Sequence, residues 1–278
     1  MSGAAPSVAV VCVHYDAAKL APTLRALERI GRAVTVQQRV FVANHENAYL
    51  ALQASPAARE GGVVLRHDNS GMEFGASQAG LERLLATHDP DWVLFANDTF
   101  ATHHSFGTVY RRKLAAELGR HHSVAAIIGQ VVALPRSFRV EGLRTHRWVT
   151  TNLFALNRAA LRALGGRVYS TALDARVVET DAMADFFAPQ IDPVLREHLE
   201  VWLFRAHPGW HWYDSDPLTA ANAAKMARKA RSILQEKFLS AALEDAAAEF
   251  VNLAELSVRD KLLREAERRL FVRLGRDL

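Results

Sequence analysis

Short apolar runs alternate with helical patterns over the first hundred residues of the chain. Val8–Tyr15 is a continuous, mostly β-branched run, which predicts a strand buried on both faces of a sheet. The runs Val40–Ala43, Val63–Leu65 and Trp92–Ala96 predict three further buried strands. Apolar residues at helical spacing in Leu20–Ile30 predict a helix between the first two strands.

A second helix is predicted over Gly75–Ala86, between the third and fourth strands. Strands and helices that alternate in this way predict an α/β fold with a mainly parallel central sheet. Polar side chains follow all four strands, at His14–Asp16, Asn44–Glu46, His67–Asn69 and Asn97–Thr99. Because open α/β sheets bind ligands beyond the carboxyl ends of their strands, the four clusters predict one shared site.

The rest of the chain is predicted to contain fewer strands and more helix. Val124–Leu134 and Trp148–Leu156 are strand-like, and a helix is predicted to follow them at Arg158–Leu164. Pro193–Phe204 is predicted to be a helix with proline in its first turn. From Thr219 onwards the chain has a single glycine and no proline, so this stretch is predicted to be mostly helical.

Composition narrows the class of protein without naming a function. Half of the 278 residues are hydrophobic and 23% are charged, which excludes a disordered chain and a fibrous repeat. The 34 Lys and Arg exceed the 30 Asp and Glu by only four, so we expect no nucleic-acid partner. Cys12 is the single cysteine, which is typical of a reducing compartment, and no signal peptide is visible. We therefore expect a cytoplasmic protein.

Five segments carry the most specific motifs, and they occur in a fixed order. They are VAVVCVHYD (Val8–Asp16), RVFVANHEN (Arg39–Asn47), HDNSGMEFGASQAGLERLL (His67–Leu85), DWVLFANDT (Asp91–Thr99) and WVTTNLFALNRAALRALGG (Trp148–Gly166). In this order they resemble segments of the inverting, family-two-like glycosyltransferases with the GT-A fold, and the resemblance covers roughly residues 8–213. The last two segments are similar to those of the rhamnan-synthesis branch.

The resemblance implies a GT-A-like nucleotide-diphospho-sugar transferase fold with a C-terminal helical extension. It implies a catalytic domain over residues 1–218, with a donor half of about 1–100 and an acceptor half of about 101–218, and a helical extension over 219–278. The implied reaction moves a sugar from a nucleoside-diphosphate donor to a polysaccharide or glycolipid acceptor. In this single displacement the acceptor oxygen attacks the anomeric carbon while the nucleoside diphosphate leaves.

The residues expected to bind the donor lie at the strand ends and on the helix that follows the third strand. They are Tyr15, Asp16, Asn44, Glu46, Asn69, Gln78, Asn97 and Asp98. The bases and ribose of nucleotides need stacking partners and hydrogen-bond acceptors, which these side chains offer. For Asn69 a plain turn at Asn69–Gly71 is an equal alternative, and Gly80 is expected to serve helix packing.

A divalent cation, Mg²⁺ or Mn²⁺, is the cofactor that the resemblance implies. The family's D-x-D motif is replaced here by Asn97-Asp98-Thr99, so only Asp98 matches an acidic position. One carboxylate together with substrate phosphates can hold such a cation, and His211 is a second candidate ligand. Two alternatives stay open, namely metal-independent catalysis and a purely structural role for Asp98 as a turn or helix cap.

An inverting transfer needs a general base that takes the proton of the acceptor hydroxyl. The family places this carboxylate about a dozen residues before a Gly-aromatic segment, and Glu197 lies twelve residues before Gly209. Asp181 is the competing candidate, and a solvated helix residue is the alternative interpretation of Glu197. The aromatic cluster Trp210–Tyr213 is expected to form either a sugar-stacking wall or a core strand.

Several other classes of enzyme lack their motifs here. The chain has no G-x-G-x-x-G after the first strand, which argues against a dinucleotide site, and no P-loop or G-x-S-x-G motif. No His or Cys spacing typical of zinc sites is present, and the adjacent pairs His103-His104 and His121-His122 cannot share one helix face. A non-catalytic GT-A-like domain that binds a carbohydrate or a partner protein stays open as the alternative function.

The C-terminal segment Ser257–Leu278 holds most of the excess positive charge. It has seven basic residues against four acidic ones, a local +3, with leucines at helical spacing between them. A basic amphipathic helix can lie on an anionic membrane, which predicts peripheral contact with the inner membrane face and a lipid-linked acceptor. The alternatives are a helix that packs on the catalytic domain and a homodimer through the C-terminal helices.

Overall fold

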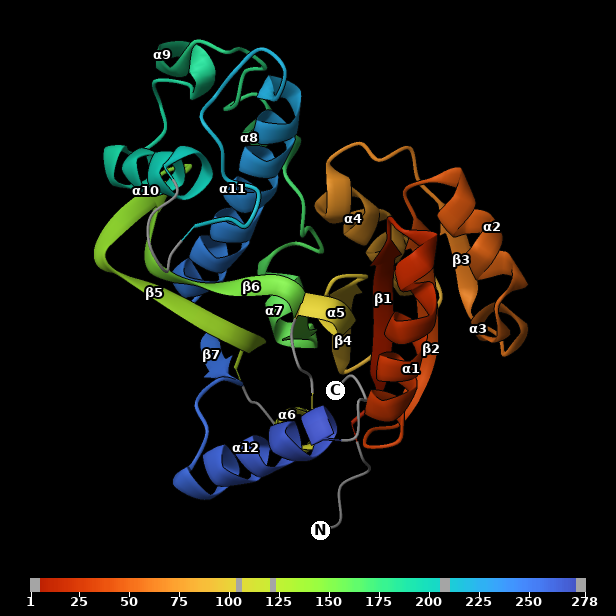
Figure 1. Ribbon diagram of the computed structural model, residues 1–278. Coiled ribbons are helices and arrows are strands. Elements are labelled where there is room, and N and C mark those ends of the chain that lie inside the picture. The colour runs from red at the N-terminus through yellow and green to blue at the C-terminus, as the bar shows by residue number, and fades with distance from the viewer. Residues whose placement is uncertain (1–5, 104–106, 121–123, 206–210, 274–278) are drawn as a thin grey trace.

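The computed structural model describes residues 6–103, 107–120, 124–205 and 211–273, and its centre is a seven-stranded sheet (Figure 1). The strand order is β3-β2-β1-β4-β6-β5-β7. The strands are β1 (Val8–His14), β2 (Val36–Ala43), β3 (Val63–Arg66), β4 (Trp92–Asn97), β5 (Ala126–Val140), β6 (Leu143–Asn157) and β7 (Glu249–Asn252). β1 to β4 pair in parallel, β6 runs antiparallel to β4 and β5, and β7 is parallel to β5.

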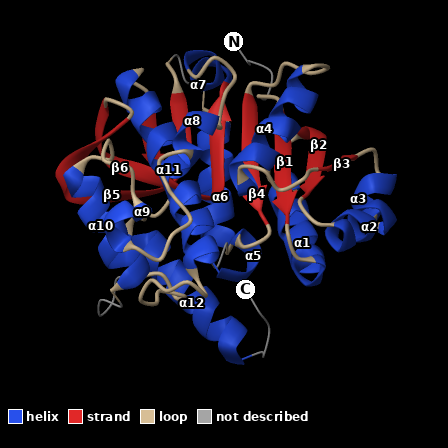
Figure 2. Ribbon diagram, turned by 90° about the horizontal axis from the view of Figure 1, so that it is seen from above, coloured by secondary structure: helices blue, strands red, loops and turns tan. Residues whose placement is uncertain are grey.

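Helices cover both faces of this sheet (Figure 2). They are η1 (Ala17–Lys19), α1 (Leu20–Gly31), α2 (Glu46–Ala54), α3 (Pro56–Arg59), α4 (Met72–Leu85), α5 (Phe100–His103), α6 (Thr108–Leu118), α7 (Arg158–Ala163), α8 (Thr171–Asp174), α9 (Met183–Phe186), α10 (Pro193–Phe204), α11 (Ala223–Asp245) and α12 (Val258–Arg273). One core cluster joins the sheet to α1, α2, α5 and α6, and a second joins its other face to α4, α7 and α11. The predicted α/β fold class, with its mainly parallel sheet and C-terminal helices, is confirmed.

The side chains of β1 alternate between the two faces of the sheet, and both sets are apolar, so each face needs a covering layer of helices. Val10 and Cys12 belong to the cluster on the α1 side, whereas Val11 and Val13 belong to the cluster on the α4 side. A Cβ atom added at Gly80 would lie 2.6 Å from Val11 Cγ1, so glycine permits the close contact between α4 and β1. This contact confirms the packing role predicted for Gly80.

All four predicted N-terminal strands are present, but one helix begins earlier than predicted and another was missed. α4 begins at Met72 rather than Gly75, directly after a turn in which Asn69, Gly71 and Met72 have positive φ. The helix α2 was missed, because its first residues were interpreted only as the polar end of the preceding strand.

The other differences lie in the second half of the sheet. β5 and β6 form one long hairpin, which turns at Glu141 and Gly142 with φ of 48° and 82°. The halves of β5 and β6 next to this turn extend beyond the central sheet and are mostly polar. The apolar pattern of the sequence therefore predicted only the other halves as strands. The C-terminal stretch is not entirely helical, since Glu249–Asn252 pairs with β5. The predicted domain boundary at residue 218 stays a prediction.

A third core cluster fills the space between the hairpin and the later helices. It packs Phe138 and Trp148 of the hairpin against Leu199 of α10 and Met226 of α11. This cluster holds α10 and α11 beside the carboxyl end of β4, which is where the sequence predicts a site. Within the part of the chain that the structure describes, no helix combines the length and apolarity needed to cross a membrane.

Candidate functional site

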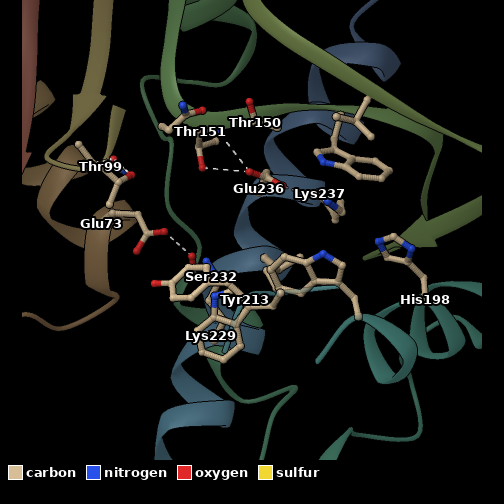
Figure 3. Close-up of a pocket in the computed structure, with 17 residues that line it drawn as sticks. Glu73, Thr99, Thr150, Thr151, His198, Tyr213, Lys229, Ser232, Glu236 and Lys237 are labelled. Carbon is tan, nitrogen blue, oxygen red and sulfur yellow. Dashed lines mark hydrogen bonds and ion pairs between the residues drawn. The ribbon is translucent and has the colours of Figure 1, made fainter. Parts of the chain in front are cut away.

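A pocket of about 510 Å³ lies between the carboxyl end of β4, the first turn of α4, the hairpin, α10 and α11. Figure 3 shows Glu73 and Thr99 at one end of this pocket and His198 at the other. Its lining residues are Glu73, Asn97, Thr99, Val132, Trp148, Thr150, Thr151, Asn152, His198, Trp202, Trp212, Tyr213, Lys229, Ser232, Ile233, Glu236 and Lys237. The pocket therefore meets the predicted site at the strand ends but extends well into the acceptor half of the chain.

Aromatic side chains form one wall of the pocket. The rings of Trp202 and Trp212 are stacked, with centroids 6.2 Å apart and planes 18° apart. Trp148 meets the His198 ring edge-on at 5.4 Å, and Tyr213 is 74% exposed at the mouth. Flat apolar faces beside polar groups suit the two kinds of surface that a sugar ring presents.

Two carboxylates line the pocket, Glu73 on α4 and Glu236 on α11. Glu73, on the first turn of α4, accepts a short hydrogen bond from the Ser232 hydroxyl of α11. Glu236 accepts hydrogen bonds from the Thr151 backbone N–H at 3.0 Å and the Thr151 hydroxyl at 3.1 Å. Glu236 also pairs with Lys237 at 3.0 Å, so its oxygens are more fully engaged than those of Glu73.

Two lysines of α11 line the same pocket. The ammonium of Lys237 is 3.3 Å from the centre of the Trp148 ring, and its side chain is only 2% exposed. Burial lowers the pKa of Lys237 to about 8, although the charge of Glu236 opposes this shift. Burial, followed by the charge of Lys237, lowers the pKa of His198 to about 3, so this imidazole is neutral at neutral pH.

The buried Lys237 makes the stability of the protein depend on pH. Its folded pKa of about 8 lies below its ordinary value of 10.5, so folding releases a proton between these two pH values. Below pH 8 both states carry the proton and the full cost of burying the charge, about 3 kcal/mol, opposes folding. As the pH rises from about 8 towards 10.5 this cost disappears, and stability rises.

Lys237→Met removes this titrating group. The free energy of unfolding of wild type minus that of the variant is therefore expected to increase by up to about 3 kcal/mol as the pH rises from about 8 towards 10.5. Urea unfolding of both proteins at about pH 7 and about pH 10 measures the difference, and other titrating groups cancel between them. Parallel pH profiles for the two proteins would show that Lys237 keeps its ordinary pKa.

Asp98, the predicted metal ligand, is 1% exposed, and one oxygen of its carboxylate binds the backbone. Its Oδ2 atom accepts hydrogen bonds from the backbone N–H groups of Tyr15 and Asp16, both at 2.8 Å. The carboxylate thus fixes the loop that follows β1 to the end of β4, and Asp98 is not among the residues that line the pocket. This contact differs from the turn or helix cap that the sequence left open as an alternative, because the bonded N–H groups belong to the distant loop after β1.

Three other predicted donor residues come together with Tyr15 at the ends of β1 and β2. Asn44 donates to Asn69 Oδ1 at 3.0 Å and to the Met72 carbonyl at 3.2 Å, and its own Oδ1 is buried without a hydrogen-bond partner among the described residues. Burial, followed by the charge of Glu73, raises the pKa of the Tyr15 hydroxyl well above its usual range. Asp16 is exposed, and its carboxylate accepts from the Ala18 N–H.

The last three predicted donor residues have separate surroundings. Asn97 lines the pocket, and its Oδ1 accepts from the Thr99 N–H at 3.0 Å. Gln78 joins α4 to the segment after α7, through hydrogen bonds to the Gly166 carbonyl and the Val168 N–H. Glu46 begins α2 and forms an exposed ion pair with Arg66 at 2.8 Å.

The structure places neither predicted base in the pocket. The Glu197 side chain is 66% exposed and pairs with Arg136 at 3.2 Å, because α10 turns the next residue, His198, inward. Asp181 is exposed in the segment before α9, and His211 is also exposed and outside the pocket lining. Of the aromatic cluster, Trp212 lines the pocket, whereas Trp210 lies outside the described residues.

The described side chains fit a protein-held cation poorly. Among them no group of three His, Cys, Asp or Glu residues comes together as a metal site. Asp98 already uses one carboxylate oxygen for two backbone N–H groups, and His211 does not reach the pocket. The positive charges that face the pocket belong to Lys229 and Lys237.

Several pocket residues were missed by sequence reasoning. Glu73 lies within the His67–Leu85 motif but was passed over in favour of Asn69 and Gln78. On α11, Lys229, Ser232 and Glu236 recur every three or four positions and so share one face of a helix otherwise rich in Ala and Leu. This polar stripe was the available signal, but only the tertiary structure shows which surface it faces.

Comparison with known proteins gives a fold-level likeness. No family model and no curated protein matches the chain. A mannosyltransferase from Pyrobaculum calidifontis in complex with GDP-Man and Mn²⁺ has 14% identity and a TM-score of 0.44. The match covers 97% of this chain and 81% of the mannosyltransferase. A 4-diphosphocytidyl-2C-methyl-D-erythritol synthase has 15% identity and a TM-score of 0.37, covering 82% and 99%.

A third similar structure is the 2-C-methyl-D-erythritol 4-phosphate cytidylyltransferase from Thermus thermophilus. It has 16% identity and a TM-score of 0.31, and the match covers 93% of this chain and 98% of that one. Because all three TM-scores are below 0.5, an activity for this chain has to be argued from its own pocket.

Proposed function

We propose that the chain is a glycosyltransferase that moves a sugar from a nucleoside-diphosphate donor to a saccharide acceptor. The observation that carries this proposal is the pocket beyond the carboxyl end of β4, where a tryptophan wall faces two carboxylates and two lysines. Aromatic faces suit sugar rings, carboxylates suit hydroxyl groups, and ammonium groups suit phosphate. The ordered motifs of the sequence support the same class of reaction.

The proposed donor position is the end of the pocket nearest to β1, β2 and β4. Asn97 and Thr99 line this end, and Tyr15 and Asn44 lie behind it at the neighbouring strand ends. The buried, unpartnered Oδ1 of Asn44 offers an acceptor for a base or ribose group of the nucleotide. The acceptor sugar would then occupy the tryptophan-lined end, between α10 and α11.

Glu73 is the general base in this proposal, in place of Glu197 or Asp181. It lies at the same end of the pocket as Thr99, close enough to Tyr15 for its charge to raise that hydroxyl's pKa. Its carboxylate takes the proton of the acceptor hydroxyl as the acceptor oxygen bonds to the anomeric carbon. The bond from that carbon to the diphosphate oxygen breaks in the same step, and the nucleoside diphosphate leaves with the electron pair.

Lys229 is proposed to stabilise the negative charge that develops on the leaving diphosphate. Its ammonium lies 5.7 Å and 5.8 Å from the centres of the Trp202 and Trp212 rings, and Lys229 is one helical turn from Ser232, the partner of Glu73 at the donor end. It has no ion-pair partner among the described residues. An ammonium without a carboxylate partner retains its capacity to bind an anion. A divalent cation, an inverting outcome, a rhamnan-type product and a lipid-linked acceptor stay predictions from the sequence.

A non-catalytic carbohydrate-binding domain is the second candidate function. The specific observation in its favour is Asp98, whose carboxylate binds two backbone N–H groups rather than pointing into the pocket. Such a protein would bind saccharide at the tryptophan wall but would neither bind nor cleave a nucleoside-diphosphate sugar.

A donor screen tests the proposal and separates the two candidates. The thermal midpoint of the protein is measured with each common nucleoside-diphosphate sugar, followed by an assay for release of the nucleoside diphosphate. At least one donor is expected to raise the midpoint and be consumed, and Lys229→Ala is expected to lower its consumption by about tenfold to a hundredfold.

Arg228→Ala is the matched control, because Arg228 is exposed on the same helix and does not line the pocket. Lys229→Arg keeps the charge and is expected to retain part of the activity. If no donor shifts the midpoint while a saccharide does, the carbohydrate-binding alternative is correct.

A further inference from the structure

Five arginines from three elements gather at the amino ends of the central strands, away from the pocket. They are Arg29 of α1, Arg32 directly after α1, Arg39 of β2, and Arg111 and Arg112 of α6. Burial, followed by the charge of Arg29, lowers the pKa of Arg111, although the charge of Glu267 opposes this shift. The carboxylate of Glu267 in α12 lies close enough to act on Arg111, so five guanidinium groups surround one carboxylate and the cluster has a net positive charge.

A hollow of about 460 Å³ opens within this cluster, between the turn from α1 to β2 and the C-terminal end of α6. Arg32 and Arg39 line it together with Val8, Val36 and other residues, and none of its lining residues is acidic. A hollow with two guanidinium groups and no carboxylate suits a phosphate-bearing group.

The helix α12 lies beside this cluster, packed on α6 (Figure 1). Glu267 of α12 accepts a hydrogen bond from the Thr108 N–H at 2.9 Å, and Arg264 donates to the Tyr110 hydroxyl at 2.7 Å. Outside these contacts, Val258 and Leu262 of α12 are 75% and 68% exposed. These are unusually exposed large apolar side chains, and on α12 they alternate with exposed basic residues.

We propose that this surface binds an anionic lipid bilayer, and we call it the basic face: Arg29, Arg32, Arg39, Arg111, Arg112, Val258, Arg259, Lys261 and Leu262. Its guanidinium groups complement anionic headgroups, and the exposed apolar residues of α12 insert between them. An acidic protein or nucleic acid would complement the charge but would leave the apolar residues without a partner. The inference is independent of the proposed function.

The position of the basic face leaves the pocket open. The hollow between Arg32 and Arg39 lies at the amino ends of β1 and β2, whereas the pocket lies beyond the carboxyl end of β4. A protein bound through the basic face therefore turns its pocket towards the aqueous phase. Donor binding and consumption by variants of the basic face are expected to equal those of wild type.

Vesicle co-sedimentation of the full chain tests the proposal. The protein is expected to sediment with vesicles that contain roughly one third phosphatidylglycerol, to bind phosphatidylcholine vesicles far more weakly, and to be released by salt. The double variant Arg29→Ala/Arg32→Ala is expected to weaken binding by about tenfold or more, since each basic residue contributes a factor of about five. Leu262→Ser is expected to weaken it by several-fold.

The control is Arg83→Ala/Arg162→Ala, which removes two exposed arginines of α4 and α7 outside the basic face and is expected to bind like wild type. Thermal midpoints equal to wild type establish that the variants are folded. Equal binding to neutral and anionic vesicles, or unchanged binding by the Arg29/Arg32 variant, would overturn the proposal. So would a lipid-free dimer that Leu262→Ser dissociates, because α12 would then be an interface between two copies.

Discussion

Glu73→Gln is expected to lower sugar transfer by about a hundredfold to ten-thousandfold while donor binding is retained. The substitution removes the proton-accepting carboxylate but keeps its size, and the amide oxygen can still accept from the Ser232 hydroxyl. The loss should therefore appear in the rate of transfer at saturating acceptor, with little change in the donor-induced shift of the thermal midpoint. Measuring both quantities on the same preparations separates catalysis from binding.

Glu197→Gln is the matched comparison. Glu197 is 66% exposed, pairs with Arg136 and lies outside the pocket, so its variant is expected to transfer sugar at nearly the wild-type rate. If Glu73→Gln is as active as wild type and Glu197→Gln is inactive, the base predicted from the sequence is correct and the proposed role of Glu73 is wrong. Loss of activity in Asp181→Asn alone would likewise assign the base to Asp181.

Asp98→Ala is expected to lower the free energy of unfolding by about 3–5 kcal/mol, or the thermal midpoint by roughly 10 °C. The substitution leaves the N–H groups of Tyr15 and Asp16 without their charged acceptor in a site where Asp98 is 1% exposed. The loop after β1 is then no longer fixed to the end of β4. Urea unfolding at neutral pH measures the loss directly.

The control for Asp98 is Asp16→Ala, which removes an exposed carboxylate that only caps a short 3-10 helix. Its cost is expected to be about 1 kcal/mol. A stability effect of Asp98→Ala that is the same with Mg²⁺ and with a chelator supports the backbone role. Wild-type stability combined with lost, metal-dependent activity would instead show that Asp98 is the metal ligand predicted from the motif.

The sequence was most informative where a local pattern has one structural solution. A run such as Val8–His14, apolar at nearly every position, fits only a strand buried on both faces, and its helices follow from their own apolar stripes. The helix Pro193–Phe204 was predicted with its observed bounds, because proline marks its first turn. In contrast, the outer half of the β5–β6 hairpin is short of apolar residues, and β7 has only four residues and a partner strand that is distant in the chain.

The candidate site was predicted in its location but only partly in its residues. The strand-end clusters indicated the edge of the sheet at which the pocket opens, and Asn97 lines the pocket there. Which side of α10 faces the pocket could not be read from spacing, so Glu197 was chosen where the neighbouring His198 lines the pocket. Motif matching likewise identified Asp98 without showing that backbone N–H groups already bind it.

The sequence by itself determined the α/β class, the parallel strands and the end of the sheet at which polar groups collect. Those features depend on periodicity and on chain direction, which are local properties. Only the tertiary structure decided that α11 brings Lys229 and Glu236 opposite Glu73 of α4, and that arginines of α1 and α6 join α12 in one surface. Such groupings depend on long-range packing of the hairpin and helices, and no sequence spacing encodes them.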